Sequence, residues 1–188
     1  MWEIRKANIN DIEAVTAIYN SIHKMEAEGL VRIGWNPSIY PVRATAEEAL
    51  QRGDLFVYEQ DGTIMASAII NRTQVPVYAT GQWAFPANDD EVMVLHTLTV
   101  DPACGGRGIG RQFVAFYEDY ALREGCPILR LDTNVVNSID YIADTDIGID
   151  DVAEDAVGDM FKDVGTLHRH DEDAEAEARG RNTGSKPR

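Results

Sequence analysis

The sequence predicts a single α/β domain, and three observations support that prediction. Its 188 residues, of which 44% are hydrophobic, are enough to build one sizeable core. Along residues 1–133, apolar side chains follow strand and helix spacings in the order β-α-α-β-β-β-α-β. A glycine-rich turn at residues 105–110 joins one of these strands directly to a helix.

Each element is predicted from its own local pattern. Capping-box patterns at Asn10–Glu13 and Thr45–Glu48 open the first two helices, and Asp61-Gly62 is a hairpin turn. The strand at 91–100 is almost continuously apolar, which predicts a central strand buried on both faces. In chain order we expect a strand at 2–7, helices from 11 to 28 and from 45, strands at 55–59, 63–71 and 91–100, a helix at 108–124 and a strand at 127–133.

The turn between the central strand and the following helix contains four glycines: Gly105, Gly106, Gly108 and Gly110. Glycine lets a chain turn sharply and bring its amides close to a ligand. The N-terminus of the following helix adds N–H groups and the positive end of the helix dipole. The turn therefore predicts a site for a phosphate or pyrophosphate; the alternative is a tight turn flanked by solvated arginines.

Composition limits the function and the location. The net charge of −15 argues against non-specific binding to nucleic acid or to an anionic membrane surface, and it favours cationic substrates such as amines. Two cysteines, Cys104 and Cys126, do not make a disulfide framework, which favours a reducing compartment. The N-terminus has no apolar signal region and no run is long enough to span a membrane, so we expect a cytoplasmic protein.

The element order and the segment Val100–Gly110 together resemble the GNAT superfamily of acyl-CoA-dependent N-acetyltransferases. The family turn reads Gln/Arg-x-x-Gly-x-Gly/Ala; Gly108 and Gly110 match it, and Gly105 departs from it at the first position. The resemblance covers about residues 1–138. It implies a mixed, largely antiparallel sheet flanked by helices, with acetyl-CoA as cofactor. It also implies transfer of the acetyl group to a primary amine of a small molecule or peptide, and it leaves homodimerisation open.

The resemblance also implies which residues hold the cofactor. A bulge in the strand before the turn would direct backbone amides of Leu98–Val100 toward pantetheine and the developing oxyanion. The turn would seat the pyrophosphate, and Asn134 and Asn137 would lie where the next strand ends. The implied cofactor-binding residues are Leu98, Thr99, Val100, Gly105, Gly106, Arg107, Gly108, Ile109, Gly110, Arg111, Asn134 and Asn137.

Direct acetyl transfer requires a base, because an ammonium with a pKa near ~10 has no lone pair. His96 is the first candidate, because it lies on the central strand and imidazole titrates near neutrality. Its alternative role is that of a partly buried histidine bonded to backbone. Glu91 is the second candidate base, with a solvated strand-start acid as its alternative. Tyr141 is a candidate proton donor to the leaving thiolate.

Aromatic residues occupy the two loops that border the acceptor site in this family. Trp35 and Tyr40 lie in one loop, and Trp83 and Phe85 lie in the other. They predict an apolar substrate pocket, with packing at the ends of the core as the alternative.

Residues after 138 depart from the family. We divide the chain into a core at 1–138, an acidic segment at 139–165 and a polar tail at 166–188; residues 140–188 hold 14 of the 32 acidic residues. A degraded match to the family's next helix at Met160–Thr166 puts Phe161 where the family has tyrosine, and nothing strand-like follows. Either a frameshift or truncation, or true divergence, explains this. The first leaves the strand before residue 134 as an open sheet edge and suggests an alternative function, a weak or inactive acyl-CoA-binding or interaction protein. The acidic run 144–155 lacks two features of a calcium loop, and we expect no metal site.

Overall fold

A computed structural model describes residues 1–80, 83, 85, 87–133 and 162–167. Within these residues, six strands form one sheet in the order β1-β2-β3-β4-β5-β6. Only β4 and β5 pair in parallel, and every other neighbouring pair is antiparallel, so the predicted mixed, largely antiparallel sheet is confirmed. The strands are β1 (Trp2–Lys6), β2 (Leu55–Gln60), β3 (Thr63–Asn71), β4 (Val92–Val100), β5 (Ile128–Thr133) and β6 (Lys162–Leu167).

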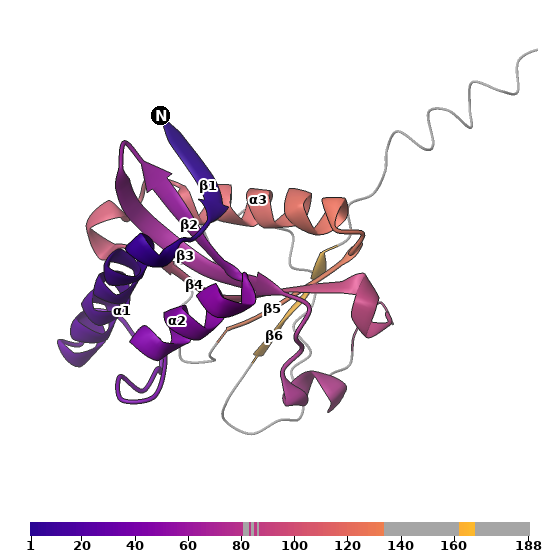
Figure 1. Cartoon of the computed structure of the whole chain (residues 1–188). Coiled ribbons are helices and arrows are strands. Elements are labelled where there is room, and N and C mark those ends of the chain that lie inside the picture. The colour runs from indigo at the N-terminus through magenta and orange to yellow at the C-terminus, as the bar shows by residue number, and fades with distance from the viewer. Residues whose placement is uncertain (81–82, 84, 86, 134–161, 168–188) are drawn as a thin grey trace, which may run out of the picture.

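Helices cover both faces of the sheet. Figure 1 shows α3 (Ile109–Arg123) on one face, and α1 (Ile12–Ala27) and α2 (Arg43–Arg52) on the other. Each helix buries an apolar stripe against the strands, and a separate hydrophobic cluster fills each face. On the α3 face, Phe113 and Tyr117 are fully buried.

The first two helices begin at residues other than those the sequence predicts. A 3-10 turn precedes α1, so the capping box forms between Asn8 and Asp11 rather than between Asn10 and Glu13. The α2 helix begins two residues before Thr45, whose hydroxyl accepts a hydrogen bond from the Val42 N–H at 3.0 Å. At α1, several polar residues near the start are able to cap, and the structure uses Asn8. At α2 the N-cap is Val42, whose side chain cannot cap, and Thr45 bonds the Val42 N–H from the third helical position.

The last strand corrects an expectation about the C-terminal part. Lys162–Leu167 pairs antiparallel with β5, so these residues form a strand and not the degraded helix predicted around them. For the same reason β5 has a neighbour on its outer side and is not the open sheet edge expected after a truncation. Residues 134–161 and 168–188, with the acidic run 144–155 and most of the predicted tail, lie outside the described residues.

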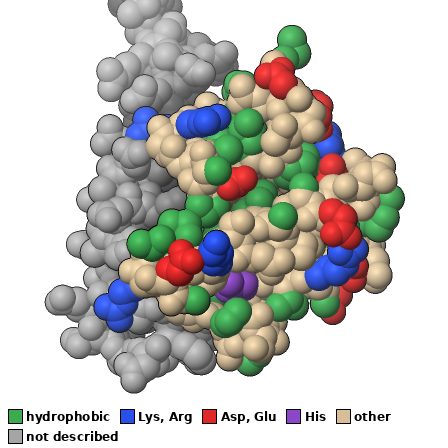
Figure 2. All heavy atoms as spheres, turned by 90° about the vertical axis from the view of Figure 1, so that its left-hand side faces the viewer, with side chains coloured by type: hydrophobic (Ala, Val, Ile, Leu, Met, Phe, Trp, Pro, Cys, Tyr) green, Lys and Arg blue, Asp and Glu red, His purple; other side chains and the backbone are tan. Residues whose placement is uncertain are grey.

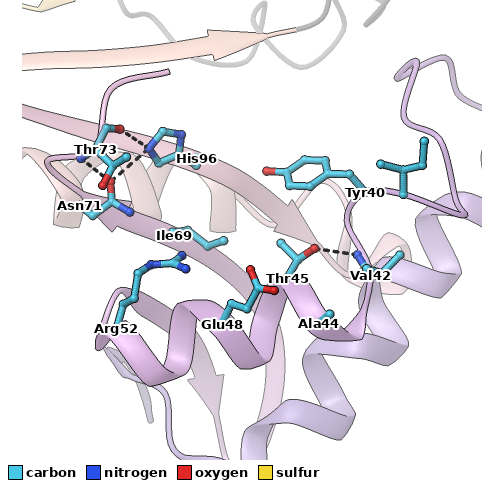
Figure 3. A pocket seen from close by; sticks show the side chains of 11 residues that line it. Tyr40, Val42, Ala44, Thr45, Glu48, Arg52, Ile69, Asn71, Thr73 and His96 are labelled. Atoms are coloured by element: carbon cyan, nitrogen blue, oxygen red, sulfur yellow. Dashed lines mark hydrogen bonds between the residues drawn. The ribbon is translucent and has the colours of Figure 1, made fainter. Parts of the chain in front are cut away.

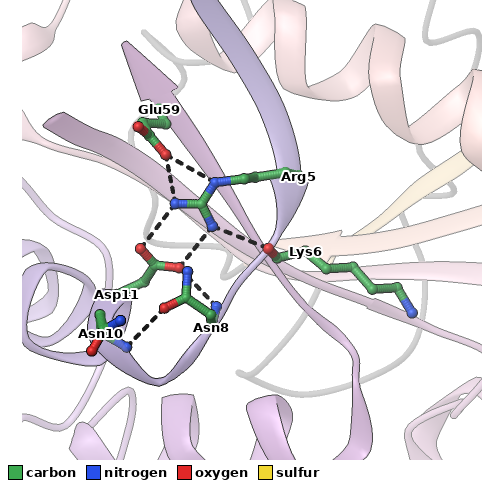
Figure 4. Close-up of polar contacts among 6 residues, drawn as sticks. All are labelled: Arg5, Lys6, Asn8, Asn10, Asp11 and Glu59. Atoms are coloured by element: carbon green, nitrogen blue, oxygen red, sulfur yellow. Dashed lines mark hydrogen bonds and ion pairs between the residues drawn. The ribbon is translucent and has the colours of Figure 1, made fainter. Parts of the chain in front are cut away.

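An ion-pair network fixes the N-terminal edge of the sheet to α1 (Figure 4). The Arg5 guanidinium donates to both Asp11 carboxylate oxygens, at 2.8 and 3.0 Å, and to Glu59 Oε2 at 2.5 Å. Asp11 is almost fully buried. Its hydrogen bonds with Arg5 lower the pKa of the Asp11 carboxyl, which therefore stays ionised in the folded protein. Three segments, β1, β2 and the start of α1, meet at this one arginine.

The described surface carries charges of both signs. On the face shown in Figure 2, acidic and basic side chains alternate around apolar ones and do not gather into a patch of one sign. None of the described helices is long and apolar enough to cross a membrane.

Candidate active site

The central strand β4 changes its partners half-way along its length. Residues Val92–Leu95 pair in parallel with Ile128–Leu131 of β5, and in the described residues this ladder ends at Leu95. From His96 onward, β4 pairs among the described residues with β3, up to Val100 opposite Ala66. In this part of the chain the structure describes no β5 partner for the backbone of Thr97–Val100, so its outward N–H and C=O groups are candidates for hydrogen bonds with a ligand.

A β-bulge marks the point where β4 leaves β5. Ser67 pairs with Thr99 and Ile69 pairs with His96, so three residue steps on β4 face two steps on β3. The extra residue is accommodated at Thr97, whose φ of 50° is a costly value for a β-branched residue. The bulge interrupts the alternation of side chains, so that His96 and Thr97 both face the side of the sheet covered by α1 and α2.

A pocket of about 550 Å³ lies on that side, between α2 and the strands β3 and β4. Figure 3 shows Tyr40 and His96 along its upper side, with Glu48 and Arg52 reaching toward it from α2 and Ile69 on its floor. The walls are thus partly apolar, and the polar groups gather at α2 and at the end of β3. The lining residues are Ile39, Tyr40, Val42, Ala44, Thr45, Glu48, Arg52, Ile69, Asn71, Thr73 and His96.

Hydrogen bonds tie the pocket to the bulge. The Tyr40 hydroxyl bonds to the Thr97 hydroxyl, and the Tyr40 ring packs edge-on against Trp35 with centroids 6.1 Å apart. His96 is half-buried, and its Nε2 lies 3.2 Å from Asn71 Oδ1 and 3.1 Å from the Thr73 carbonyl oxygen. The loop before α2 and the end of β3 therefore hold the two bulge side chains in place from opposite sides.

The glycine-rich turn has the geometry of an anion site. Gly106 and Gly108 have φ values of 74° and 71°, which side chains rarely adopt, and Gly108 is the N-cap of α3. The first i→i−4 bond of α3 runs from the Gln112 N–H to the Gly108 carbonyl oxygen, so the N–H groups of Gly108–Gly110 have no acceptor inside the helix. Residues 105–108 are exposed. The turn thus fits a phosphate-bearing group such as that of coenzyme A.

The comparisons with known proteins decide the family. The family model described as "Acetyltransferase (GNAT) family" matches residues 16–141, well over half of the chain. The chain belongs to the GNAT acetyltransferase family.

Solved GNAT structures share the fold of this chain at low sequence identity. One is a GNAT-family acetyltransferase from Listeria monocytogenes 4b F2365, with a TM-score of 0.66 and 19% identity, covering 88% of this chain and 95% of that one. Another is the PaiA N-acetyltransferase from Thermoplasma acidophilum in complex with coenzyme A (TM-score 0.60, 16% identity, 88% and 99% covered). A third is the ribosomal-protein-S18-alanine N-acetyltransferase from Escherichia coli (TM-score 0.57, 16% identity, 92% and 97% covered). A sequence search of curated proteins returned no match.

The structure brings together most of the cofactor-binding residues that the GNAT resemblance implies. Leu98–Val100 lie on the part of β4 that has left β5, and eight residues after Val100 the chain reaches the N-cap of α3 at Gly108. Arg107 and Arg111 are exposed beside the turn. Asn134, Asn137 and the predicted proton donor Tyr141 lie outside the described residues.

Four of the residues predicted to act as a base or to form the substrate pocket do not line the pocket: Glu91, Trp35, Trp83 and Phe85. Glu91 precedes the other end of β4, where Oε2 accepts hydrogen bonds from the Asn88 N–H and Nδ2 groups, each at 2.9 Å, and thereby caps a 3-10 turn. Trp83 stacks on the Arg130 guanidinium at 3.9 Å and donates from Nε1 to the Tyr78 carbonyl. Trp83 therefore packs at the end of the core, which is the alternative role considered for it. Phe85, in the same loop, is exposed and does not line the pocket.

Residues of this region that were not predicted from the sequence include Asn71, Glu48 and Arg52, which line the pocket, and Thr97 and Asp54, which bond to lining residues. Thr97 gave no signal, because a threonine in a strand is ordinary and a bulge depends on the register with β3. Asn71 and Asp54 did carry one, since each is a polar residue next to an apolar strand: Asn71 ends β3, and Asp54 comes directly before β2.

Proposed function

We propose that this GNAT protein transfers the acetyl group of acetyl-CoA directly to a primary amine of a small molecule or peptide. The observation that carries the proposal is the bulge at Thr97. It lies just beyond the last described pair between β4 and β5, and it puts Thr97 beside His96 on the side of a pocket large enough for a small amine or a peptide end.

The residues that would hold acetyl-CoA lie on a continuous stretch of chain from β4 to α3. The N–H groups of Gly108–Gly110 and the turn glycines would bind the pyrophosphate, with Arg107 and Arg111 as charge partners. The one-sided backbone of Leu98–Val100 would hydrogen-bond the pantetheine arm and stabilise charge on the thioester oxygen. When bound, acetyl-CoA supplies an activated acetyl group on a thiol that leaves readily as thiolate.

The acceptor would enter the pocket on the face of the sheet that α1 and α2 cover, whereas α3 and the glycine-rich turn before it lie on the other face. An amine arrives mostly as an ammonium ion, and the Glu48 carboxylate together with the negative net charge of the chain would attract it. His96 would then take one proton from the ammonium, directly or through a water molecule, which leaves the amine with a lone pair for attack. Tyr40 would hold its part of the pocket wall against the bulge through its hydrogen bond to Thr97.

The reaction needs no nucleophile on the protein. Both cysteines are buried, and burial raises the pKa of the Cys126 thiol, so a thiolate intermediate at that residue is disfavoured. Two free cysteines also fit the reducing cytoplasm in which we expect the protein to work.

A turnover assay with a coenzyme A binding assay tests the proposal. The purified full-length chain is given acetyl-CoA and a panel of amines, polyamines, amino acids and peptides, and thiol release is followed. We expect release that depends on an amine, with thermal stabilisation by coenzyme A. Stabilisation without release on any amine would favour the alternative function, an acyl-CoA-binding or interaction protein. Neither stabilisation nor release would contradict both.

A further inference from the structure

His96 is the end of a chain of hydrogen bonds that runs from α2 to β4. The Arg52 Nε donates to Asp54 Oδ2 at 2.9 Å, and the Asn71 Nδ2 donates to the same oxygen at 3.0 Å. The Asn71 Oδ1 in turn lies 3.2 Å from His96 Nε2. Three of these four residues line the pocket, and the fourth, Asp54, is only 18% exposed at its side chain.

The orientation of the Asn71 amide is determined without reference to the histidine. Its oxygen accepts from the Thr73 backbone N–H at 2.8 Å, and an N–H can only donate. Its nitrogen faces the Asp54 carboxylate, which can only accept when ionised. Two independent neighbours therefore place the carbonyl oxygen of Asn71, and not its NH₂ group, against His96.

That orientation decides which nitrogen of His96 carries the proton. Nε2 faces two acceptors, Asn71 Oδ1 at 3.2 Å and the Thr73 carbonyl oxygen at 3.1 Å (Figure 3). Both contacts are favourable only if Nε2 donates. A neutral imidazole has a single N–H, so Nδ1 is left with the lone pair.

We propose that Asn71 and Asp54 are positioning residues that hold His96 in the Nε2–H tautomer, with Nδ1 as the nitrogen that accepts the proton. The proposal rests on the proposed function only in using His96 as the base. When Nδ1 takes a proton from an ammonium, the positive imidazolium is held by Nε2–H bonds to Asn71 and Thr73, and the Asp54 carboxylate behind Asn71 favours that charge. Arg52 binds the same carboxylate oxygen and holds it in place.

The tautomer can be measured without cofactor or substrate. In the full-length protein with ¹⁵N-labelled histidine, long-range proton–nitrogen spectra distinguish a protonated from an unprotonated ring nitrogen. The chain has four histidines, and loss of one signal set in His96→Gln assigns His96. At a pH where the imidazole is neutral, we expect a protonated Nε2 and an unprotonated Nδ1. A protonated Nδ1 would overturn the proposal.

Substitutions then test the two positioning residues. Asn71→Ala should shift His96 toward a mixture of tautomers and lower kcat/KM about tenfold, the worth of one hydrogen bond to the ring. Asp54→Ala should act in the same direction by about threefold, and it serves if Asn71→Ala does not fold. The matched control is Thr73→Ala. It should leave the tautomer of His96 unchanged, because Thr73 contacts His96 only through its backbone carbonyl oxygen.

The outcomes separate this proposal from the proposed function. An unchanged tautomer in both Asn71→Ala and Asp54→Ala would overturn the positioning role. The expected tautomer, and its shift in Asn71→Ala, would support that role whether or not any amine is acetylated. Absence of turnover with the expected tautomer would then count against the proposed function alone.

Discussion

The two halves of β4 belong to one strand of nine residues, yet they are built for different purposes. Val92–Leu95 pairs with β5, Val94 and Leu95 also pair with β3, and each of the four side chains is less than 5% exposed. Beyond the bulge, Leu98 and Val100 are half-buried, and among the described residues the strand pairs with β3 only. The first half stabilises the sheet, and the second half is the one that we propose binds ligands.

The candidate site therefore depends on an interruption in the pairing of β4 and not on a separate loop. Tyr117 of α3 fastens the first half: its hydroxyl donates to the Met93 carbonyl oxygen at 2.6 Å and lies 3.0 Å from the Arg130 carbonyl oxygen, so it bridges β4 and β5. Because β4 and β5 pair along Val92–Leu95, the sheet stays intact although no pair between the two strands is described after Leu95. Strain at Thr97 is tolerated because strand pairing on both sides of the bulge holds the backbone in place.

The largest effect is expected in the half of β4 from His96 to Val100, which we call the site half. His96→Gln should lower kcat/KM for acetyl transfer about 10²–10⁴-fold, because it removes the proposed base. Coenzyme A affinity, measured by calorimetry on the same protein, should be unchanged, since the cofactor binds through backbone beyond the bulge. Equal losses in turnover and in affinity would show that His96 acts on the fold of the site and not on the proton.

Substitutions away from the candidate site should instead change the stability of the fold. Asp11→Asn should lower the free energy of unfolding by about 3 kcal/mol at pH 7, because Arg5 loses a buried charged partner. The lowered pKa of Asp11 means that its contribution is present above its unfolded pKa of about 3.9 and disappears as the pH falls through the folded value. Urea unfolding at pH 7 and at acid pH checks this. The prediction would be contradicted if the difference in unfolding free energy between Asp11→Asn and the unsubstituted protein did not become smaller at acid pH.

A smaller stability effect should come from the link between β4 and β5. Tyr117→Phe should cost about 2 kcal/mol, because it leaves buried backbone groups of both strands without the hydroxyl. The matched control is Tyr120→Phe on the same helix, where the ring packs on Phe56 and the loss should stay below about 0.5 kcal/mol. Denaturant titration measures both. Equal stability of the two variants would show that the Tyr117 hydroxyl does not hold β4 to β5.

The turn can be tested against an equivalent glycine elsewhere. Gly108→Ala should weaken coenzyme A binding about tenfold, because a side chain at a φ of 71° strains the N-terminus of α3. Gly125, just beyond the other end of α3, has a φ of 77° and also has nothing within 4 Å of an added Cβ. Gly125→Ala should therefore lose a similar stability, about 1 kcal/mol, and keep its coenzyme A affinity. Thermal unfolding and calorimetry separate the two effects.

The smallest effect should come from the pocket wall. Tyr40→Phe removes the hydroxyl that bonds to Thr97 and should lower kcat/KM about fivefold, in keeping with one lost hydrogen bond. The loss should appear in KM for the amine and not in KM for acetyl-CoA. The opposite split would place Tyr40 on the cofactor side of the bulge.

The sequence was sufficient where a feature depends on neighbouring residues. The glycine-rich turn, the inward face of α3 and the Asp61-Gly62 hairpin could each be predicted, because turns and amphipathic helices are local. The bulge could not, since it depends on which residues of β3 lie opposite His96 and Thr99. The bond between His96 and Asn71 joins residues 25 positions apart, and it exists only in that register. The pocket, too, is formed by segments that are distant in sequence.

The contrast within β4 can be tested most directly by mapping coenzyme A onto the backbone amides. Titration of the ¹⁵N-labelled protein should shift the amide signals of Leu98–Val100 and of Gly106–Arg111, and it should leave those of Val92–Leu95 almost unchanged. That result would show that the cofactor binds where β4 has left β5 and at the N-terminus of α3. Equal shifts along the whole of β4, or shifts confined to residues outside both segments, would contradict the division of this strand into a scaffold half and a site half.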